Sequence, residues 1–311
     1  MFFCKGIDIM TDKLAAVVVT YNRLSLLKKN IEALQKQKLK INMDILIIDN
    51  ASTDGTGKYI KELKNKKIQY FNTGKNIGGA GGFNYGIRKA VEEKYKWIWV
   101  MDDDTIPTPT AAEFLLAVDE RLNGNFGFLS SRVLWKNGKA CIMNSPKYHF
   151  RKIDQDLLKD EITEITQASF VSFFVRRQTI LEVGLPIKDF FIWGDDVEFS
   201  RRIALKFKKR SFIVKNSVVY HYMTSNKGSN IALDSVNRIE RYRYAYRNEF
   251  FLYRQGKLYD LIYFSLKCIY NMMKIILCSN NYKFKRAKVL LSAVMEGKSF
   301  EPKIENEFLT R

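Results

Sequence analysis

Apolar and polar positions follow one another in a regular order through the first 100 residues. Short apolar runs rich in β-branched residues lead into polar loops, and segments with apolar residues at helical spacing come next. The runs predict strands over residues 14–19, 43–48, 68–72 and 97–101, and the spacing predicts helices over 25–38, over 56–64 and up to 91. This alternation predicts an α/β fold with a mostly parallel, doubly wound sheet flanked by helices.

Polar loops directly follow all four of these predicted strands. The carboxyl ends of parallel strands meet at one edge of a sheet, where α/β folds bind their ligands. The loop residues that we expect at this edge are Thr20, Tyr21, Asn22 and Arg23; Asp49 and Asn50; Asn76, Gly78, Gly79 and Gly82; and Asp102, Asp103 and Asp104. Ser52 and Asp54 occupy positions typical of an N-cap before the helix at residue 56.

Less regular patterns occupy the rest of the chain. Residues 126–135, 165–175 and 218–221 predict further strands, and a basic helix is expected from the Asp195–Asp196 pair through Lys208. Residues 235–278 predict two helices broken near Gly256.

Charge is distributed unevenly over the chain. Of the formal net charge of +19 in 311 residues, +15 lies in residues 201–311, which contain 23 Lys and Arg against 8 Asp and Glu. This asymmetry suggests that the second part meets something anionic.

The four cysteines form no CxxC pair, so we expect neither a zinc site nor disulfides, and a cytosolic setting fits. The start lacks the apolar stretch of a signal peptide, and Met1 and Met10 both fit as the first residue.

Three adjacent carboxylates, Asp102 to Asp104, follow an apolar strand that contains Trp97 and Trp99. Adjacent like charges repel one another unless a cation offsets them. Oxygen ligands at a strand end suit Mg²⁺ or Mn²⁺, which would bridge to a diphosphate. The alternative is a solvated acidic turn, but the apolar strand in front favours a metal site.

Two other motifs are candidates for chemistry. The glycine cluster of residues 76–82 is neither a P-loop nor a dinucleotide fingerprint, and before a helix it is either a flexible turn or a close backbone approach to a ligand. Asp195 and Asp196 follow aromatic residues, among them Trp193, at a predicted helix start. They are either partners of the helix dipole or, because burial beside apolar rings raises basicity, a general base.

The chain has two histidines, His149 and His221. His149 lies in a polar loop and is assigned to the surface. His221 ends a predicted strand, where a lone histidine is more often structural than a ligand.

Residues 14–222 resemble the family-2 glycosyltransferases with a GT-A fold, and within them the galactofuranosyltransferases of bacterial polysaccharide and cell-wall synthesis. The opening Val-Val-Thr-Tyr-Asn-Arg, up to Arg23, looks like the first donor loop of that family. Asp49-Asn50-Ala51-Ser52 looks like the loop whose Asp recognises uracil. The glycine cluster is similar to the NxGGAGG stretch of galactofuranosyl and rhamnosyl enzymes.

The resemblance also implies roles for the acidic residues and His221. Asp102 and Asp104 would hold Mn²⁺ or Mg²⁺, Asp103 would lie by the ribose, and His221, 25 residues beyond Asp196, falls where the family places a metal-binding His. Trp193-Gly194-Asp195-Asp196 resembles the WDD segment, whose second Asp is the base. Gly194 is an insertion in that pattern, so the base is Asp196 or, one residue back, Asp195.

The implied reaction is an inverting transfer of a sugar, galactofuranose from UDP-galactofuranose, onto a saccharide. A rhamnosyltransferase using a dTDP donor is the nearest alternative. A nucleic-acid-binding protein is the alternative from another class, because residues 238–254 interleave Arg with Tyr. That alternative leaves the aligned polar loops unexplained, so no nucleic acid is expected as a partner.

We expect a catalytic domain over residues 1–232 and a basic helical region over 233–311. No stretch of 18 uncharged apolar residues occurs, so we expect no conventional membrane span. The 21 residues from Leu258 to Cys278 are interrupted by Asp260, Lys267 and Lys274, and the two lysines recur on one helical face. This pattern favours a helix lying on an anionic leaflet, at the inner face of the cell membrane beside a lipid-linked acceptor; a core-facing helix is the alternative.

Overall fold

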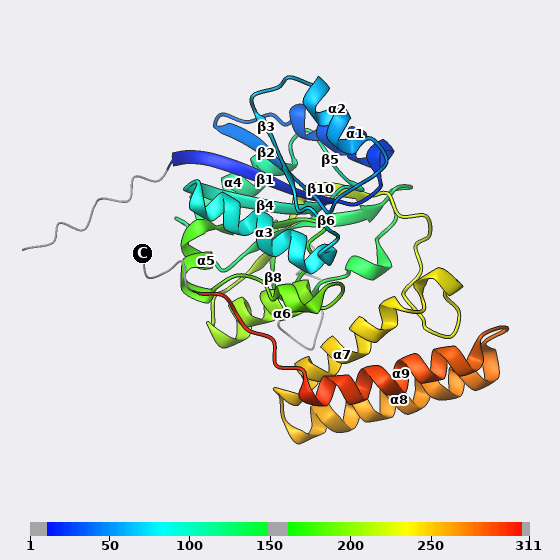
Figure 1. Cartoon of the computed structure of the whole chain (residues 1–311). Coiled ribbons are helices and arrows are strands. Elements are labelled where there is room, and N and C mark those ends of the chain that lie inside the picture. Colours follow the sequence, from blue (N-terminus) through cyan, green and yellow to red (C-terminus); the bar gives the residue numbers. More distant parts are fainter. Residues whose placement is uncertain (1–10, 149–160, 307–311) are drawn as a thin grey trace, which may run out of the picture.

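The computed structural model describes residues 11–148 and 161–306 (Figure 1). Met1, Cys4, Met10 and His149 lie outside the described residues. The strands are β1 (Thr11–Thr20), β2 (Asn42–Asp49), β3 (Ile68–Asn72), β4 (Tyr95–Asp102), β5 (Thr105–Pro107), β6 (Leu129–Trp135), β7 (Lys147–Tyr148), β8 (Ile162–Gln167), β9 (Phe173–Arg176) and β10 (Phe212–His221). The α-helices are α1 (Leu24–Gln35), α2 (Thr56–Glu62), α3 (Gly78–Glu92), α4 (Ala111–Arg121), α5 (Arg177–Val183), α6 (Asp195–Arg201), α7 (Arg241–Arg254), α8 (Leu258–Cys278) and α9 (Lys283–Ser299).

The sheet has the strand order β3-β2-β1-β4-β9-β6-β10-β8-β7, with β5 paired to β10. Its first four strands are parallel, as the sequence predicts. Strand β1 is buried on both faces: Val17 packs with one hydrophobic cluster, against α3, and Val18 packs with the other, against α1 and α4. Helices therefore cover both faces of the sheet, which explains why its central strands are continuously apolar.

The second half of the sheet is mixed. Strand β9 lies antiparallel between β4 and β6, whereas β6 and β10 are parallel. The strand predicted over 165–175 is two strands, β8 and β9, which pair with different partners. The basic helix predicted through Lys208 ends as α6 at Arg201 and continues as one π-helical turn, where the buried Arg202 donates to the carbonyls of Val183 and Leu185.

The start of α2 also differs from the expectation. Its N-cap is Gly55, which has a left-handed φ of 89°, and neither Ser52 nor Asp54 occupies that position. The Asp54 carboxylate instead accepts hydrogen bonds from the backbone N–H of Thr56 and from that of Leu24, the first residue of α1. Asp54 therefore links the starts of two helices.

Helices α7, α8 and α9 pack together around their own hydrophobic cluster, beside α6 (Figure 1). The two helices predicted over residues 235–278, with a break near Gly256, are confirmed as α7 and α8, and α9 follows them. The segment after α9 returns to the sheet region, where Glu305 pairs with Arg88 and Lys188 and accepts from Asn84. The cysteines in the described part of the chain, Cys141, Cys268 and Cys278, are unpaired, as expected.

Helix α8 exposes an uncharged face. It is long and apolar enough to cross a membrane, with a mean hydropathy of 1.5 over its best 18 residues, of which 11% are buried. Its exposed residues are Leu258, Tyr259, Ile262, Tyr263, Ser265, Leu266, Ile269, Tyr270, Met273, Ile276, Leu277 and Cys278. Lys267 lies on the other side, because it forms an ion pair with Glu249 of α7, whereas the Lys274 ammonium lies over the ring of the exposed Tyr270. Lys267 is therefore turned toward α7, and contact of α8 with a leaflet stays a prediction.

Candidate active site

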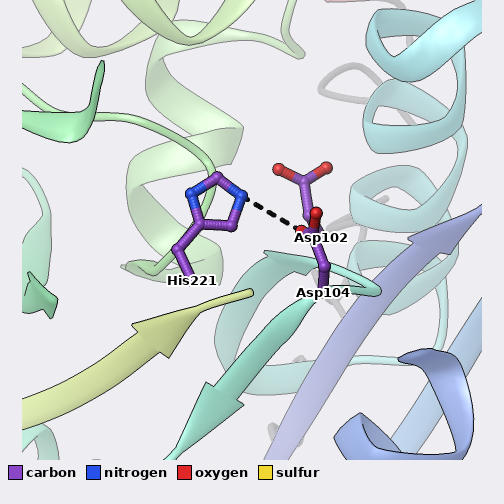
Figure 2. A group of neighbouring side chains, drawn as sticks. All are labelled: Asp102, Asp104 and His221. Carbon is purple, nitrogen blue, oxygen red and sulfur yellow. Dashed lines mark ion pairs between the residues drawn. The ribbon is translucent and has the colours of Figure 1, made fainter. Parts of the chain in front are cut away.

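Three strand ends bring the candidate metal ligands together. Asp102 ends β4, Asp104 follows in the tight turn into β5, and His221 ends β10, which pairs with β5. One ligand atom from each of the three side chains lies within 4.8 Å of the other two (Figure 2). Two carboxylates and an imidazole form a donor set that suits Mn²⁺ or Mg²⁺.

Arg23 and Thr20, from the end of β1, engage the same carboxylates. Arg23 Nη1 donates to Asp103 Oδ1 at 3.1 Å and to Asp104 Oδ2 at 2.7 Å. Thr20 Oγ1 donates to Asp103 Oδ2 at 2.7 Å. The first and fourth polar loops therefore meet as predicted. Tyr21 is 44% exposed and lies at the rim of this edge.

The acidic cluster is short of positive charge. Burial, followed by the charge of Asp104, raises the pKa of Asp102 to about 7, and burial raises the pKa of Asp103 to about 6 although Arg23 opposes it. Burial also acts to raise the pKa of Asp104, but His221 and Arg23 outweigh it and hold that pKa below its usual range. A further cation here would relieve repulsion between carboxylates.

Asp104 Oδ1 is the atom that fits a metal best. It lies 3.1 Å from His221 Nε2, yet it is fully buried and has no well-aligned hydrogen bond from the described residues. The opposite ring nitrogen, His221 Nδ1, is 2.8 Å from Asn144 Oδ1. An amide oxygen only accepts, so Asn144 holds the proton on Nδ1 and turns Nε2 toward Asp104, as partners of metal-binding histidines do. Sequence reasoning missed Asn144.

The first two polar loops are tied to each other. Asn22 accepts from the backbone N–H of Thr53 and donates its own backbone N–H to Ser52 Oγ. Asp49 is fully buried, and its carboxylate accepts from Tyr70 Oη at 2.6 Å and from the backbone N–H of Ser52 at 2.8 Å. Since a carboxylate has about four lone-pair sites, Asp49 retains capacity to accept from a ligand.

The glycine cluster makes its close approaches to the protein itself. A Cβ on Gly82 would lie 2.6 Å from Val19 Cγ1 of β1, and a Cβ on Gly78, which has a φ of 76°, would lie 2.0 Å from the carbonyl oxygen of Phe191. Glycine at these positions lets α3 pack against β1 and against the Phe191 loop. Gly79 contrasts with them, because an added Cβ would meet nothing nearer than Phe83 at 4.0 Å.

Hydrogen bonds fix the loop that leads into the cluster. Asn76 Oδ1 accepts from the backbone N–H of Gly78 at 2.9 Å, and Asn50 Nδ2 donates to the Gly78 carbonyl at 3.0 Å. The second and third polar loops therefore also meet at the sheet edge. Their neighbour Phe191 accepts from the backbone N–H of Ala80 in the first turn of α3.

The segment before α6 has an unusual backbone. Phe191, Trp193 and Gly194 have φ values of 63°, 65° and 91°, in the left-handed region that L side chains rarely adopt. Helix α6 then begins with Asp195, as predicted. A non-glycine residue in this region persists only where its surroundings hold it, and such strain is concentrated at functional sites.

Asp195 and Asp196 differ in surroundings. Asp195 is 6% exposed, and burial, followed by the charge of Asp196, raises its pKa well above the usual range. The charge of Asp102 contributes to the same shift, which indicates that Asp195 lies near the acidic cluster. Burial raises the pKa of Asp196 to about 6, while its Oδ1 accepts from the backbone N–H of Val197. Both carboxyls are therefore unusually basic for aspartate.

Helix α7 holds the strained segment in place. Asn248 Nδ2 donates to the carbonyls of Phe190, Ile192 and Trp193 at 2.9, 3.2 and 2.8 Å. Arg247 Nη2 adds a hydrogen bond to the Asp189 carbonyl. Trp193 also packs edge-on against Tyr242 of α7. Sequence reasoning missed Asn248, because a single asparagine inside a helix has no signal of its own.

Solved structures of glycosyltransferases have the same overall fold. TarS of S. aureus, crystallised in complex with UDP, superposes over 93% of this chain and 72% of that chain with a TM-score of 0.53 and 15% identity. GalNAc-T7 with UDP, GalNAc and Mn²⁺ superposes over 82% of this chain and 54% of that chain, with a TM-score of 0.57 and 16% identity. The fold is therefore that of the GT-A glycosyltransferases.

Sequence comparison narrows the class. The model of glycosyl transferase family 2 matches residues 15–182, and the chain belongs to that family. Galactofuranosyltransferase GlfT1 of Mycobacterium tuberculosis is 28% identical over 208 residues, which are 62% of this chain and 65% of that relative. GlfT1 of Mycolicibacterium smegmatis is 26% identical over 209 residues, 62% of this chain and 66% of the relative. The chain thus spans slightly less than two thirds of the length of these relatives.

We expect Asn248→Ala to destabilise the protein and slow its reaction. The substitution removes the Asn248 Nδ2 donor from three carbonyls of a strained segment, at a cost of about 1–3 kcal/mol in the free energy of unfolding. Urea denaturation measures this cost, and Asn137→Ala in an exposed turn is the control. If Asn248→Ala keeps wild-type stability and activity, α7 does not hold this segment.

Proposed function

We propose that this glycosyltransferase is a metal-dependent, inverting enzyme that transfers galactofuranose from UDP-galactofuranose to a saccharide acceptor. The single observation that carries the proposal is the meeting of Asp102, Asp104 and His221 at the sheet edge, with Asp195 electrostatically close to them. A metal-ligand set and a basic carboxyl close to it are the two parts that a metal-dependent inverting transfer requires.

Asp102, Asp104 and His221 would hold Mn²⁺ or Mg²⁺. Such an ion supplies Lewis-acid stabilisation of the negative charge that develops on a leaving diphosphate. Arg23, between Asp103 and Asp104, adds a fixed positive charge at the same place. Asp103, held by Thr20, lies where the ribose of the donor is proposed to bind.

The proposed donor loops are those tied together at the sheet edge. Asp49 would recognise uracil, with Asn50 and the Thr20–Arg23 loop completing the nucleotide site. Asn76, Gly78, Gly79 and Gly82 would line the sugar side, where Gly79 has open space before it. The two GlfT1 relatives support galactofuranose as the sugar, and dTDP-rhamnose is the alternative donor.

The chemical step is a single displacement. Asp196 removes the proton from the acceptor hydroxyl, the acceptor oxygen forms a bond to the anomeric carbon, and the bond from that carbon to the diphosphate oxygen breaks. The electron pair leaves with UDP. Attack from the face opposite the leaving group inverts the anomeric configuration. Trp193, beside this carboxyl pair, would help to exclude water from the acceptor side.

Donor binding should depend on both the metal and the nucleobase of the donor. In Mn²⁺ we expect saturating UDP to raise the melting temperature by about 5 °C, and to raise it more than CDP or GDP does. Asp104→Ala should abolish this shift without unfolding the protein, because it removes like-charge repulsion together with a ligand. Differential scanning fluorimetry measures the shifts.

Asp12→Ala, at a carboxylate far along the sequence from the site, is the control and should leave the UDP shift unchanged. An undiminished shift in EDTA would contradict the metal site. Equal shifts with all three nucleotides would remove the uracil assignment, and a larger shift with dTDP would favour the rhamnosyl alternative.

Loss of the base should affect the rate and not donor binding. Asp196→Asn should lower sugar transfer by about 10²-fold or more, the scale of general-base catalysis, with UDP binding unchanged. The carboxyl must be ionised to accept a proton, and its raised pKa of about 6 means that the wild-type rate should climb as the pH rises toward that value and level off above it. A bound cation moves this limb to lower pH.

Asp196→Asn should not show the rise in rate with pH that we expect of the wild type. Asp195→Asn is the matched comparison and should cost less. If Asp195→Asn alone is inactive while Asp196→Asn transfers sugar normally, the base is Asp195.

We further propose that residues 1–232 form the catalytic part and residues 233–311 a region that attaches to an anionic membrane near a lipid-linked acceptor. The support is the uncharged exposed face of α8, beside exposed lysines of α9 such as Lys285 and Lys288. Apolar side chains rimmed by cations suit an interfacial helix on anionic lipid at the inner leaflet.

We expect Ile269→Glu, in the middle of that face, to weaken binding to phosphatidylglycerol vesicles by about tenfold or more. The change replaces an exposed aliphatic side chain that would be buried in the lipid with a charge that anionic lipid repels. Vesicle co-sedimentation at low salt measures binding. Leu233→Glu, also at an exposed leucine but outside α8, is the control. Equal binding of Ile269→Glu and the wild type, or no binding of the wild type, contradicts the attachment. Cutting after Gly256 is a poorer test, because it also removes the contacts of Glu305 with the catalytic part.

A further inference from the structure

A cavity of about 370 Å³ opens between the start of α6 and helices α7 and α8. Trp193 and Gly194 line it, so it adjoins the two carboxyls that begin α6. Tyr242 and Tyr246 of α7 line it as well. The cavity therefore adjoins the proposed base, and none of the lining residues belongs to the acidic cluster at the end of β4.

Cations outnumber acids around this cavity. Lys147, Arg201 and Lys267 line it, and Glu249 is the one acid among the lining residues of the described chain. Glu249 is already paired with Lys267. The Arg201 side chain makes no hydrogen bond or ion pair with any residue in the described ranges, and Lys147 has no carboxylate partner of its own there.

These cations act on one another. Burial, and then the charges of Arg201 and Lys267, lower the pKa of Lys147, which places the three groups close enough to repel. Cations that face a shared space without matching acids are stabilised by an anion there, and guanidinium and ammonium groups are the usual ligands of phosphate.

The cavity also borders the helix with the exposed apolar face. Lys267 and Asn271 of α8 point into it, while Leu266 and Ile269 of the same helix face outward and are 60% and 56% exposed. A single helix thus separates the cationic cavity from the surface proposed to meet lipid. An anionic group carried at the head of a membrane lipid would reach the cavity from that side.

We propose that this cavity binds the phosphate or diphosphate group through which a saccharide acceptor is joined to its carrier lipid, with Arg201 and Lys147 as its main ligands. The inference rests on the proposed function, which supplies the acceptor. Anchoring that group beside Trp193 would present the saccharide to the carboxyls at the start of α6.

The proposal is tested by the binding of farnesyl diphosphate, measured by calorimetry. The measurement is made in EDTA so that no metal recruits the diphosphate to the acidic cluster. Arg201→Gln should weaken binding by about tenfold or more, because it removes a charge-assisted contact. The Arg201 side chain is exposed and has no ion-pair partner in the described part of the chain, so the variant should fold normally. Lys208→Gln, an equal change of charge on an exposed residue outside the cavity, should bind like the wild type.

Inorganic pyrophosphate and farnesol distinguish the source of the anion. If pyrophosphate binds more weakly than farnesyl diphosphate and farnesol does not bind, the ligand is a group carried by a lipid. If the two diphosphates bind equally, the anion site is supported and its ligand is a phosphate without a lipid. No binding to the wild type, or equal binding to Arg201→Gln, overturns the proposal. The rise in melting temperature with UDP and Mn²⁺ is measured on the same proteins. If the wild type shows no such rise, the proposed function is contradicted, while the result for the cavity stands.

Discussion

Concentrated negative charge at the carboxyl end of β4 is the constraint around which this molecule is organised. Three consecutive carboxylates, two of them buried, repel one another in a place where water screens them poorly. The chain offsets that repulsion with groups brought from distant segments: Arg23 from the loop after β1 and His221 from the end of β10. The parallel sheet delivers these groups to one edge, and the turn after β4 pairs with β10 through β5.

The basic helical region is part of the same arrangement. Asn248 of α7 donates to three carbonyls of the segment before α6, and the carbonyl of Phe191 in that segment accepts from the first turn of α3. Glu305 returns to pair with Arg88 of α3. The carboxyls at the start of α6 are thus held from both sides, and a change in α7 reaches the proposed base through a few hydrogen bonds.

Local patterns were enough to predict the first four strands, because each is a short apolar run that ends in a polar loop. The insertion of β9 between β4 and β6 could not be predicted that way, since strand pairing depends on partners far along the chain. The site residues that end strands carry a positional signal, as Asp102 and His221 do. Asn144 and Asn248 carry none, because an asparagine acquires its role only from the carbonyl or imidazole that the fold places beside it.

Two sequence patterns had structural explanations that the pattern alone did not indicate. Gly78 and Gly82 allow α3 to approach Phe191 and β1 closely, in addition to any role in donor binding. Lys267 of α8 faces α7 because Glu249 pairs with it, and the outward face of α8 is left without charge. Periodicity identified the amphipathic helix, but the partners that settle its orientation lie in another helix.

The most direct measurement is anomalous diffraction from crystals soaked with Mn²⁺ and UDP. We expect one manganese peak bounded by Asp102, Asp104 and His221, with the diphosphate of UDP on its open side and uracil beside Asp49. A peak elsewhere, or UDP bound at this edge without manganese, would contradict the claim that these strand ends form a metal-dependent donor site.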